Sequence, residues 1–438
     1  MQKKSVNVEK NVSYTKEIPY YGHFDVVVLG GGPAGVCAAI EAAESKKSVL
    51  LVEATGMLGG MATSGLVGPF MTCYDRDGNI SVVGGLFRRI VDKLADYNAV
   101  YKPEELDSPS IHTSFIERYH RHVTAFDSFY LQLVLDEMTQ NAGVNVMLYT
   151  RFADCICENN KIKKVILSAL EGLVAADADI YIDCTGNADV AATAGVYTYK
   201  GEEKSGVPQP ATLMFEVSGV EDEGFIERNE RPIRPVKAYR TPTDGKYKVN
   251  HYRVFDVDAT NSKSMTNAHI QARKQVLDAY KVLQEKTEGF ENAKIAQVAS
   301  VLGVRESRHI EGKYKITVDD IINGTKFDDR IATYGYGMDV HPRNETESGN
   351  FKIEVAQRYY IPYMSLIPEG CDNLIVAGKT ISCESQAAGG LRCMPCAMSM
   401  GQAAGIASVL AVDNNCKPEN ISICTLQSIL RAKGAILD

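Results

Sequence analysis

Short apolar runs alternate with small-residue segments at the start of the chain. Residues 24–29 and 48–52 are continuous runs of mostly β-branched and aliphatic side chains, a pattern that predicts strands buried on both faces of a sheet. The Ala-rich segment 36–45 between them predicts a helix packed against that sheet. Together the three segments have the size of one strand–helix–strand crossover, about 30 residues.

Helical periodicity recurs in the middle and at the end of the chain. Helices are expected after Gly84-Gly85, where apolar residues follow at positions 86, 90, 91 and 94, and at residues 129–140, 268–284, 292–302 and 395–412. The helix at 268–284 has an apolar side made of Ile270, Val276, Leu277, Tyr280 and Leu283. Strands are expected at residues 144–157, 163–169, 173–176, 180–183 and 373–377, and residues 205–260 are β-rich.

The order of these segments indicates an α/β protein whose main domain is discontinuous. Both ends of the chain have strands followed by glycines and Ala-rich helices, whereas residues 205–355 are richer in strands. We therefore expect one α/β domain built from both ends, with an α+β insert between them. Residues 1–20 contain no apolar segment and are set aside as a loose N-terminal arm without a secretory signal.

A glycine-rich turn links the first strand to the first helix. Gly30, Gly32 and Gly35 have the spacing of the dinucleotide fingerprint. In that motif the first glycine makes the turn, the second admits the pyrophosphate and the third lets helix and strand pack closely. Glu53 follows at the end of the next strand, where it can accept the ribose hydroxyls and would repel a 2′-phosphate. This context predicts a bound dinucleotide but does not by itself decide between FAD and NAD.

Gly59-Gly60 and several later segments carry a resemblance to a known family. GGGPAG followed by E-x-x-G-x-x-GG is similar to the flavoprotein oxidoreductases with a glutathione-reductase-type FAD domain. The segments DIYIDCTGNADVAATAG, QPATLMFEVSGV, GVRESRHIEGKY and AGKTISCESQAAGGLRCMPCAMSMGQAAG resemble those of the FAD-dependent oxidoreductase family, a relative of the fumarate reductase and succinate dehydrogenase flavoproteins. The resemblance runs from about residue 22 to residue 412.

This resemblance implies non-covalent FAD in a Rossmann-type domain of three layers (ββα), with an inserted α+β substrate domain. Residues 21–204 and 356–438 would form the FAD-binding domain, and residues 205–355 the substrate or cap domain. Ala153 would face the adenine edge, and the last helix would begin at the flavin. The motif and the resemblance together imply these cofactor-binding residues: Gly30, Gly32, Pro33, Ala34, Gly35, Glu53, Ala54, Gly59, Gly60, Met61, Ala62, Ala153, Thr185, Gly186, Asp189, Gly378, Leu391, Arg392 and Met394.

Two features depart from the family pattern. Ser385 and Ala388 stand where members often carry histidines, so this loop offers no histidine base. Cys393 and Cys396 form a C-x-x-C pair that the family usually lacks. Such a pair at a helix N-terminus could act as a redox dithiol, or the two thiols could be small buried residues at a packed helix start. The chain has no second dinucleotide fingerprint, so we expect no dedicated domain for NAD(P)H.

Arginines and histidines in these segments are the candidates for substrate chemistry. Oxidation by a flavin needs a hydride acceptor and often a base, and an anionic substrate needs a cation to hold it. The candidates are Arg305, Arg308, His309, His341 and Arg392, with Glu384 and Tyr363 as weaker ones on position alone. We expect the arginines or the histidine at 305–309 to form an anion-holding pocket with Arg392, unless Glu306 or Glu311 pairs the arginines locally.

Composition and charge exclude several classes of partner. The net charge is −8, from 47 Lys and Arg against 55 Asp and Glu without a basic block, so nucleic acid and anionic membranes are poor partners. The charge-free apolar stretch at 26–40 is too short to span a membrane. Eleven scattered cysteines favour reduced thiols in a cytoplasmic protein, and no residue set has metal-ligand spacing. The oligomeric state stays open, and a homo-oligomer is compatible with the sequence.

These observations predict an FAD-dependent oxidoreductase that transfers a hydride between flavin N5 and a small polar metabolite, such as a carboxylate or a sugar derivative. The identity of the electron acceptor or donor stays undefined. Two alternatives remain. One is a flavin–dithiol relay through Cys393 and Cys396, and the other is a protein that binds FAD without turnover.

Overall fold

The computed structural model of the chain describes residues 14–105, 121–221, 236–344 and 353–438. Most of the predicted N-terminal arm, residues 1–13, lies outside the described residues, and residues 14–19 have no regular secondary structure. The first strand begins at Tyr20, slightly earlier than its apolar run predicts.

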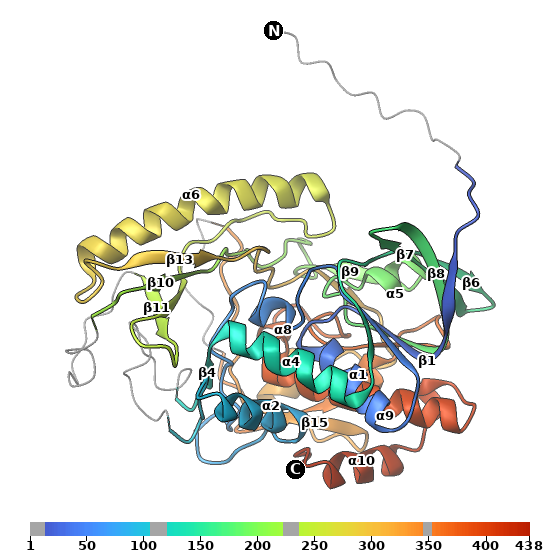
Figure 1. Cartoon of the computed structure of the whole chain (residues 1–438). Coiled ribbons are helices and arrows are strands. Elements are labelled where there is room, and N and C mark those ends of the chain that lie inside the picture. The colour runs from blue at the N-terminus through green and yellow to red at the C-terminus, as the bar shows by residue number, and fades with distance from the viewer. Residues whose placement is uncertain (1–13, 106–120, 222–235, 345–352) are drawn as a thin grey trace.

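The regular elements follow the chain in the order seen in Figure 1. The helices are α1 (Pro33–Glu44), α2 (Gly85–Asp96), α4 (Ser128–Ala142), α5 (Asp189–Thr193), α6 (Ser262–Lys286), α7 (Val318–Asn323), α8 (Ala388–Leu391), α9 (Met394–Asp413) and α10 (Ile423–Ala432), with short 3-10 turns η1 (Gly60–Ala62), η3 (Tyr363–Leu366) and η4 (Pro418–Asn420). The strands are β1 (Tyr20–Leu29), β2 (Val49–Val52), β3 (Val100–Tyr101), β4 (Ala125–Phe126), β5 (Asn145–Met147), β6 (Arg151–Glu158), β7 (Lys161–Ala169), β8 (Gly172–Asp183), β9 (Thr198–Lys200), β10 (Phe215–Ser218), β11 (Lys237–Arg240), β12 (Tyr247–Asn250), β13 (Lys294–Val298), β14 (Arg308–Ile310), β15 (Arg330–Tyr334), β16 (Tyr359–Pro362) and β17 (Leu374–Val376).

The main sheet is parallel at its centre and antiparallel at one side. Its strands run in the order β5–β2–β1–β8–β7–β6, and β17 also pairs with β8. The pairs among β5, β2, β1, β8 and β17 are parallel, whereas β8, β7 and β6 form an antiparallel meander. β8 is long enough for both roles, because residues 172–176 pair with β7 and residues 175–183 pair with β1. The predicted α/β class and Rossmann-type arrangement are confirmed.

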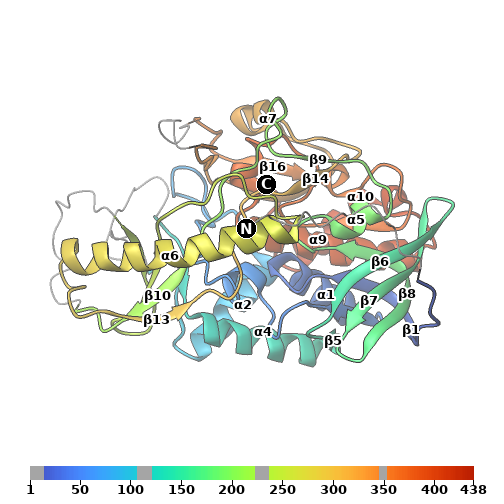
Figure 2. The same cartoon turned by 90° about the horizontal axis from the view of Figure 1, so that it is seen from above.

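A second sheet with its own core lies at the end of the molecule away from the meander (Figures 1 and 2). It is antiparallel, in the order β11–β12–β10–β13, and α6 packs along it. Apart from Leu66, the buried apolar residues of this core come from residues 211–302. The later part of the predicted insert, between Ile316 and Val355, packs with the first core instead. By packing, the insert therefore has its own core over 211–302, and the boundaries expected at 205 and 355 stay predictions.

Several predictions about secondary structure are wrong because strand pairing and packing override local periodicity. Within the predicted helix 292–302, residues 294–298 form β13, which pairs with β10. The predicted strand 144–157 is interrupted between β5 and β6, and the strands expected at 173–176 and 180–183 are the single strand β8. Ile270 and Leu277 of α6 are 50% and 55% exposed. The buried side of α6 consists of Ala268, Ala272, Val276, Ala279 and Leu283.

α9 and α1 approach each other backbone to backbone in the centre of the first core. A Cβ atom at Gly401 would lie 2.1 Å from the carbonyl oxygen of Ala34, and one at Gly405 would lie 2.4 Å from that of Ala38. Real Cβ atoms do not come that close to a backbone oxygen, so only glycine permits this contact at the present helix separation.

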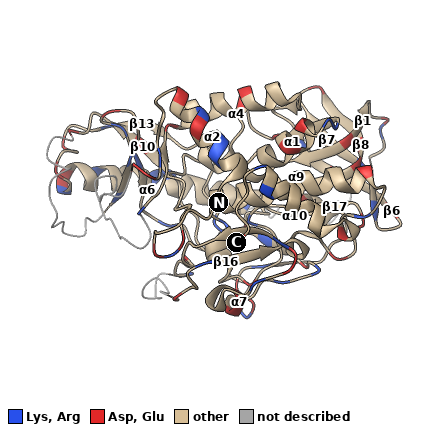
Figure 3. Cartoon of the chain, turned by 90° about the horizontal axis from the view of Figure 1, so that it is seen from below, with Lys and Arg blue, Asp and Glu red and all other residues tan. Residues whose placement is uncertain are grey.

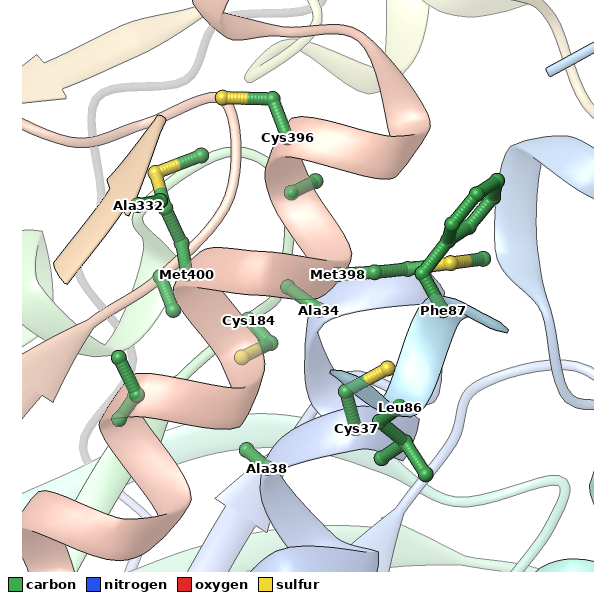
Figure 4. Close-up of a cluster of buried hydrophobic side chains, with 14 of the residues drawn as sticks. Ala34, Cys37, Ala38, Leu86, Phe87, Cys184, Ala332, Cys396, Met398 and Met400 are labelled. Atoms are coloured by element: carbon green, nitrogen blue, oxygen red, sulfur yellow. The ribbon is translucent and has the colours of Figure 1, made fainter. Parts of the chain in front are cut away.

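The apolar character of α9 is explained by its burial. Residues 394–412 are charge-free and longer than the stretch at 26–40 on which the expectation of no membrane span rested. Among the described residues α9 has the length and hydropathy of a membrane span, but 89% of its most apolar window is buried inside the protein. In Figure 4 the side chain of Met398 points toward Phe87 of α2, and Met400 lies near Ala332 of β15. The core thus provides an apolar environment for this helix.

Replacement of Gly401 by alanine tests the close contact between α9 and α1. The alanine gains about 1 kcal/mol of helix propensity, but its Cβ must displace the Ala34 backbone, and overpacking of this kind typically costs about 1–3 kcal/mol. We expect a lower urea midpoint for Gly401→Ala. Ser399→Ala, on the partly exposed side of the same helix, should change the free energy of unfolding by about 0.5 kcal/mol or less. A Gly401→Ala protein as stable as the wild type would contradict the contact.

Candidate functional site

Two glycines of the first turn are required by the packing of the protein itself. Gly30 has a φ of +104°, and a Cβ atom there would lie 2.3 Å from the carbonyl oxygen of Cys184 at the end of β8. A Cβ atom at Gly35 would lie 1.8 Å from the carbonyl oxygen of Gly30. These two positions make the turn and bring α1 onto β1 and β8, as the motif predicts.

Gly32 is different because nothing in the protein requires it. Its φ is −72°, which any residue adopts, and no atom lies within 4 Å of the position that a Cβ would occupy. Gly32 is the N-cap of α1 and offers no side-chain hydrogen bond to the first turn. The free space and the uncapped N–H groups together fit a pyrophosphate at the N-terminus of this helix.

The acid at the end of β2 holds the glycine turn in place. Glu53 is 8% exposed. Its Oε2 accepts a hydrogen bond from the N–H of Gly31 at 2.8 Å, and its Oε1 accepts bonds from the N–H and Oγ1 of Thr55 at 2.7 and 2.8 Å. Oε2 accepts one bond and keeps a second lone pair, so a ribose hydroxyl at this position remains compatible with Glu53. The neighbouring Ala54 is exposed.

The second glycine pair folds back onto the first turn. The N–H of Gly59 donates to the carbonyl oxygen of Gly31 at 2.8 Å, and a Cβ at Gly60 would lie 2.9 Å from the Cα of Gly32. Gly59 and Gly60 have φ values of +99° and +52°, so both tolerate other side chains poorly. The predicted cofactor residues at 30–35 and 59–62 thus meet in space.

Other predicted cofactor residues lie around the same cleft or at its margin. The buried carboxylate of Asp183 accepts hydrogen bonds from the N–H groups of Thr185 and Ala191, at 3.0 Å each, and this fixes the loop after β8. Gly378, after β17, lies against Ala34 of α1. Ala153 is exposed on the edge strand β6, and its role at the adenine edge stays a prediction.

A cavity of about 210 Å³ lies between the two cores. Met61, Met394 and Arg392 line it on the side of the first core, and Arg253 and Arg305 line it on the side of the insert. Over the chain as a whole, Lys and Arg are interspersed with Asp and Glu (Figure 3). The cavity is different, because among the described residues five cationic side chains and one carboxylate line it. The charged lining residues are Lys237, Arg253, Arg305, Lys379, Arg392 and Asp339.

Arg305 is buried in this cavity without a carboxylate partner among the described residues. Its Nη1 donates to the carbonyl oxygen of Pro210 at 2.8 Å and to Oγ1 of Thr212 at 2.7 Å. Burial, together with the charges of Arg392 and Arg253, lowers the pKa of Arg305 to about 9. A guanidinium held this way is unfavourable until an anion joins it.

Asp339, the acid among the described lining residues of the cavity, is paired with neighbouring side chains. Nη2 of Arg392 donates to the carbonyl oxygen and to Oδ2 of Asp339, at 3.0 Å each. Nε2 of His341 lies 3.2 Å from the same Oδ2. Burial opposes ionisation of Asp339, but His341 and the guanidinium groups of Arg392 and Arg305 outweigh it and hold the pKa of Asp339 well below its usual range.

His341 is fixed as a neutral imidazole. Its Nδ1 accepts a hydrogen bond from Nε of Arg253 at 3.1 Å, so the ring proton belongs on Nε2, which faces Asp339. Burial and the charge of Arg305 lower the pKa of His341 to about 3. Both ring nitrogens are therefore engaged, and His341 orients Asp339 rather than offering a free lone pair.

Lys379 lines the cavity and was missed by the sequence analysis. It follows Gly378 directly, and its Nζ donates to the carbonyl oxygen of Val304 at 2.6 Å. Burial and the charge of Arg392 lower the pKa of Lys379 to about 7. No sequence motif marks it, because a lone lysine after a glycine has no signature. The sequence analysis also missed Lys237, Arg253 and Asp339, because single charged residues outside a motif give no signal in the sequence.

Arg308 and His309 do not reach the cavity, so their expected place in the anion pocket is wrong. Arg308 donates to Oδ1 of Asp189 at 2.8 Å, so it forms an ion pair with an acid other than Glu306 or Glu311. His309 is 1% exposed and its Nδ1 lies 3.1 Å from the carbonyl oxygen of Ile381. The weaker candidates are also structural: Glu384 accepts from the N–H of Val318, and Tyr363 donates to the carbonyl oxygen of Pro418.

The two cysteines at the start of α9 are buried thiols. Cys393 lines the cavity and Cys396 does not. Burial raises the pKa of Cys393 to about 12 and that of Cys396 well above its usual value. Because the thiolate is the reactive form, this environment favours unreactive thiols.

Comparisons with known proteins agree with this geometry. The sequence profile of the family "FAD dependent oxidoreductase" matches residues 25–430, and the chain belongs to this family. It is similar to the soluble pyridine nucleotide transhydrogenase of Marinomonas sp. (54% identity over 41 residues) and to the FAD-dependent oxidoreductase dbaF of Emericella nidulans (43% over 79 residues). These matches span only 9% and 16% of the chain and of each relative. The relationship expected to the fumarate reductase group stays a prediction.

A solved structure supports the fold. The p-nitrophenol 4-monooxygenase PnpA from Pseudomonas putida is similar with a TM-score of 0.50 and 11% identity, over 91% of this chain and 82% of that one. A geranylgeranyl bacteriochlorophyll reductase-like protein from Thermoplasma acidophilum has a TM-score of 0.45 and 14% identity, over 94% and 84%. The family and the free space at Gly32 together establish FAD as the cofactor that this cleft fits.

Gly32 and Gly35 make a matched pair for testing the cofactor cleft. Gly32→Ala adds a methyl group to open space, so the apoprotein should unfold at the wild-type urea midpoint while FAD affinity falls, because the pyrophosphate loses its close approach to the backbone. Gly35→Ala forces a clash with Gly30 and should lower the apoprotein midpoint itself. Calorimetric FAD titration and urea unfolding separate the two effects. Unchanged FAD affinity in Gly32→Ala would remove this position from the site.

The lowered pKa of Lys379 predicts a pH-dependent stability. An unfolded lysine has a pKa of about 10.4, whereas Lys379 in the folded protein titrates at about 7. Between these values the unfolded chain binds more protons, so this residue makes stability rise with pH, and its penalty is complete below about pH 7. Lys379→Met removes the penalty. The free energy of unfolding of the variant minus that of the wild type, at matched FAD saturation, should be larger at pH 6 than at pH 9. Equal differences would contradict the shift.

Proposed function

We propose that this protein is an FAD-dependent oxidoreductase that oxidises a small anionic metabolite, such as a hydroxylated carboxylate, in the cavity between its two cores. The observation that carries the proposal is the excess of cationic side chains in that cavity, above all the buried guanidinium of Arg305, which has no carboxylate partner in the described segments. Buried charges are stable only when they are paired. A substrate anion would supply the missing partner.

Arg305 and Arg392 would have different roles in holding such a substrate. The guanidinium of Arg305 offers a planar fork that fits a carboxylate at two points, and its bonds to Pro210 and Thr212 fix the direction of that fork. The side chain of Arg392 is held in place by Asp339, so it contributes to the positive electrostatic potential of the cavity from a fixed position. Bound FAD would supply the hydride acceptor. The chain's own residues therefore orient the substrate and fix which of its carbon atoms faces the cofactor.

Neither alternative has an observation in its favour. The thiol relay would need a reactive thiolate, and burial disfavours one at Cys393 and Cys396. A protein that binds FAD without turnover has no use for an enclosed cationic cavity beside the cofactor cleft. Both thiols are better explained as packing residues at the start of α9, where Met394 and Pro395 are also buried.

Anaerobic mixing with small carboxylates tests the proposal. Holoprotein is mixed with a panel of hydroxylated and aliphatic carboxylates, each beside its neutral methyl ester, and the flavin absorption band is followed. We expect bleaching by a subset of the anions and not by their esters. Arg305→Lys should retain FAD and reduce the rate by about tenfold to a hundredfold, because lysine lacks the fork.

Arg308→Lys is the matched control, since it changes an arginine three residues away whose partner is Asp189 outside the cavity. It should leave the bleaching rate within about twofold of the wild type, as expected for a distant site. Bleaching by esters and anions alike, or by none of the compounds, would contradict the proposed function.

A further inference from the structure

The cavity holds a second chemical feature besides its positive charge, namely an amine that can be neutral. Lys379 leaves β17 through the turn at Gly378 and ends among cations rather than acids. Its Nζ has one hydrogen bond, to the carbonyl oxygen of Val304 at 2.6 Å, and no ion pair within the described residues. An ammonium in that position has two further protons without protein acceptors, whereas a neutral amine has a lone pair to offer.

The groups that influence the pKa of Lys379 favour its neutral form, with the exception of two acids. Burial and Arg392 lower its pKa to about 7, and Glu306 and Asp189 oppose this only in part. Glu306 is directed elsewhere, because its carboxylate accepts bonds from the N–H of Gln209 and from Oγ of Ser385. Asp189 is paired with Arg308. The remaining titratable groups of the cavity are Lys237, Tyr239, Arg253, Arg305, Tyr336, Asp339, His341 and Cys393.

Apart from Lys237, whose pKa is also lowered by burial and by the charge of Arg253, the other candidates are unsuited to accept a proton near neutral pH. Asp339 is held by Arg392 and His341, which keep its pKa far too low. His341 has both ring nitrogens engaged. The phenols Tyr239 and Tyr336 and the thiol Cys393 have raised pKa values and keep their protons. A general base works best when its pKa lies near the working pH, and the pKa of Lys379, at about 7, meets that condition.

We propose that Lys379 is the general base of this site and that the substrate is a hydroxylated anion whose hydroxyl proton passes to Nζ of Lys379; this rests on the proposed function above. The hydroxyl O–H bond breaks, its electron pair forms the second bond of a C=O group, and the proton completes an ammonium on Lys379. The carbon loses its hydrogen with two electrons as a hydride, for which bound FAD would be the acceptor. The substrate would thereby become a carbonyl compound, with the two electrons passing to the cofactor.

The first arm of the test measures the charge of Lys379 without any substrate. Nitrate does not change its own charge over the range from pH 6 to pH 8.5, and its binding to holoprotein can be followed through the flavin spectrum. We expect the dissociation constant of nitrate to rise by about tenfold over that range in the wild type, as one nearby positive charge is lost. The rise should be absent in Lys379→Met. A pH-independent wild type, or a rise that persists in Lys379→Met, overturns the proposal.

Lys248→Met is the matched control for this arm. Lys248 is another buried lysine whose pKa burial lowers, to about 8, but it donates to Oγ of Ser128 and does not line the cavity. Its variant should show the same pH dependence of nitrate binding as the wild type. Loss of the rise in Lys248→Met as well would show that the effect does not come from Lys379 and would overturn the assignment.

The second arm uses a hydroxylated carboxylate that bleaches the wild-type flavin. Lys379→Ala with full FAD occupancy should reduce flavin about a hundredfold more slowly or worse, as expected for loss of a general base. Added methylamine or ethylamine should restore the rate in proportion to the concentration of the neutral amine. A merely structural lysine would not be replaced in this way.

The outcomes separate the two proposals. Wild-type rates in Lys379→Ala, or a loss that no amine restores, overturn the role of Lys379 while leaving the oxidoreductase intact. If no hydroxylated carboxylate bleaches the wild type but other anions do, the site is an anion oxidase without this base, and the inference about Lys379 fails alone. Failure of every anion contradicts the proposed function and the inference together.

Discussion

The molecule is organised around a place where separate stretches of backbone touch with no side chain between them. The turn after β1 meets the end of β8 at Gly30, α1 meets that turn at Gly35, and α9 meets α1 at Gly401 and Gly405. Segments near residues 30, 184 and 401 are brought together there, although most of the chain separates them. These close backbone contacts depend on how the segments pack in space and not on their separation along the chain. Segments from both ends of the chain can therefore form one domain. The position of the cofactor cleft follows from them, since Gly32 is the one member of the glycine motif left facing open space.

The same constraint explains how the cavity acquires its charges. The start of α9 is fixed against α1, which places Arg392 and Met394 at the edge of the first core. The cationic residues of the insert then face it across the gap. A cluster of like charges in a partly buried space is self-repelling, and within the described part of the chain Asp339 is the carboxylate that relieves this repulsion. The fold therefore maintains an arrangement that the described residues do not neutralise, and this is the observation on which the proposal of an anionic ligand rests.

Sequence reasoning succeeded where local pattern determines structure and failed where distant residues do. The continuous apolar runs, the glycine spacing and the small-residue composition of α9 were enough to predict the α/β fold and the turn at 30–35. β13 was predicted as a helix because its pairing with β10 is a tertiary contact without a local signal. Ile270 and Leu277 were assigned to the wrong side of α6, because three alanines together with Val276 and Leu283 form the side that faces the sheet. Lys379 could not be found at all, since only the folded cavity gives a lone lysine its environment.

The segment 305–309 shows why residue type alone could not define the site. Arg305 enters the cavity, whereas Glu306 points into a buried network in which it binds Gln209 and Ser385 and lies 3.7 Å from the guanidinium of Arg343. The local pairing of Glu306 with Arg305 that the sequence left open is therefore not made; Glu306 neutralises a different arginine. Its network anchors the backbone next to Arg305, so the guanidinium is held in the cavity by neighbours that leave its charge unpaired. Adjacent residues thus have different roles: Glu306 stabilises the backbone, and Arg305 carries the unpaired charge. Only the direction in which each side chain points distinguishes these roles.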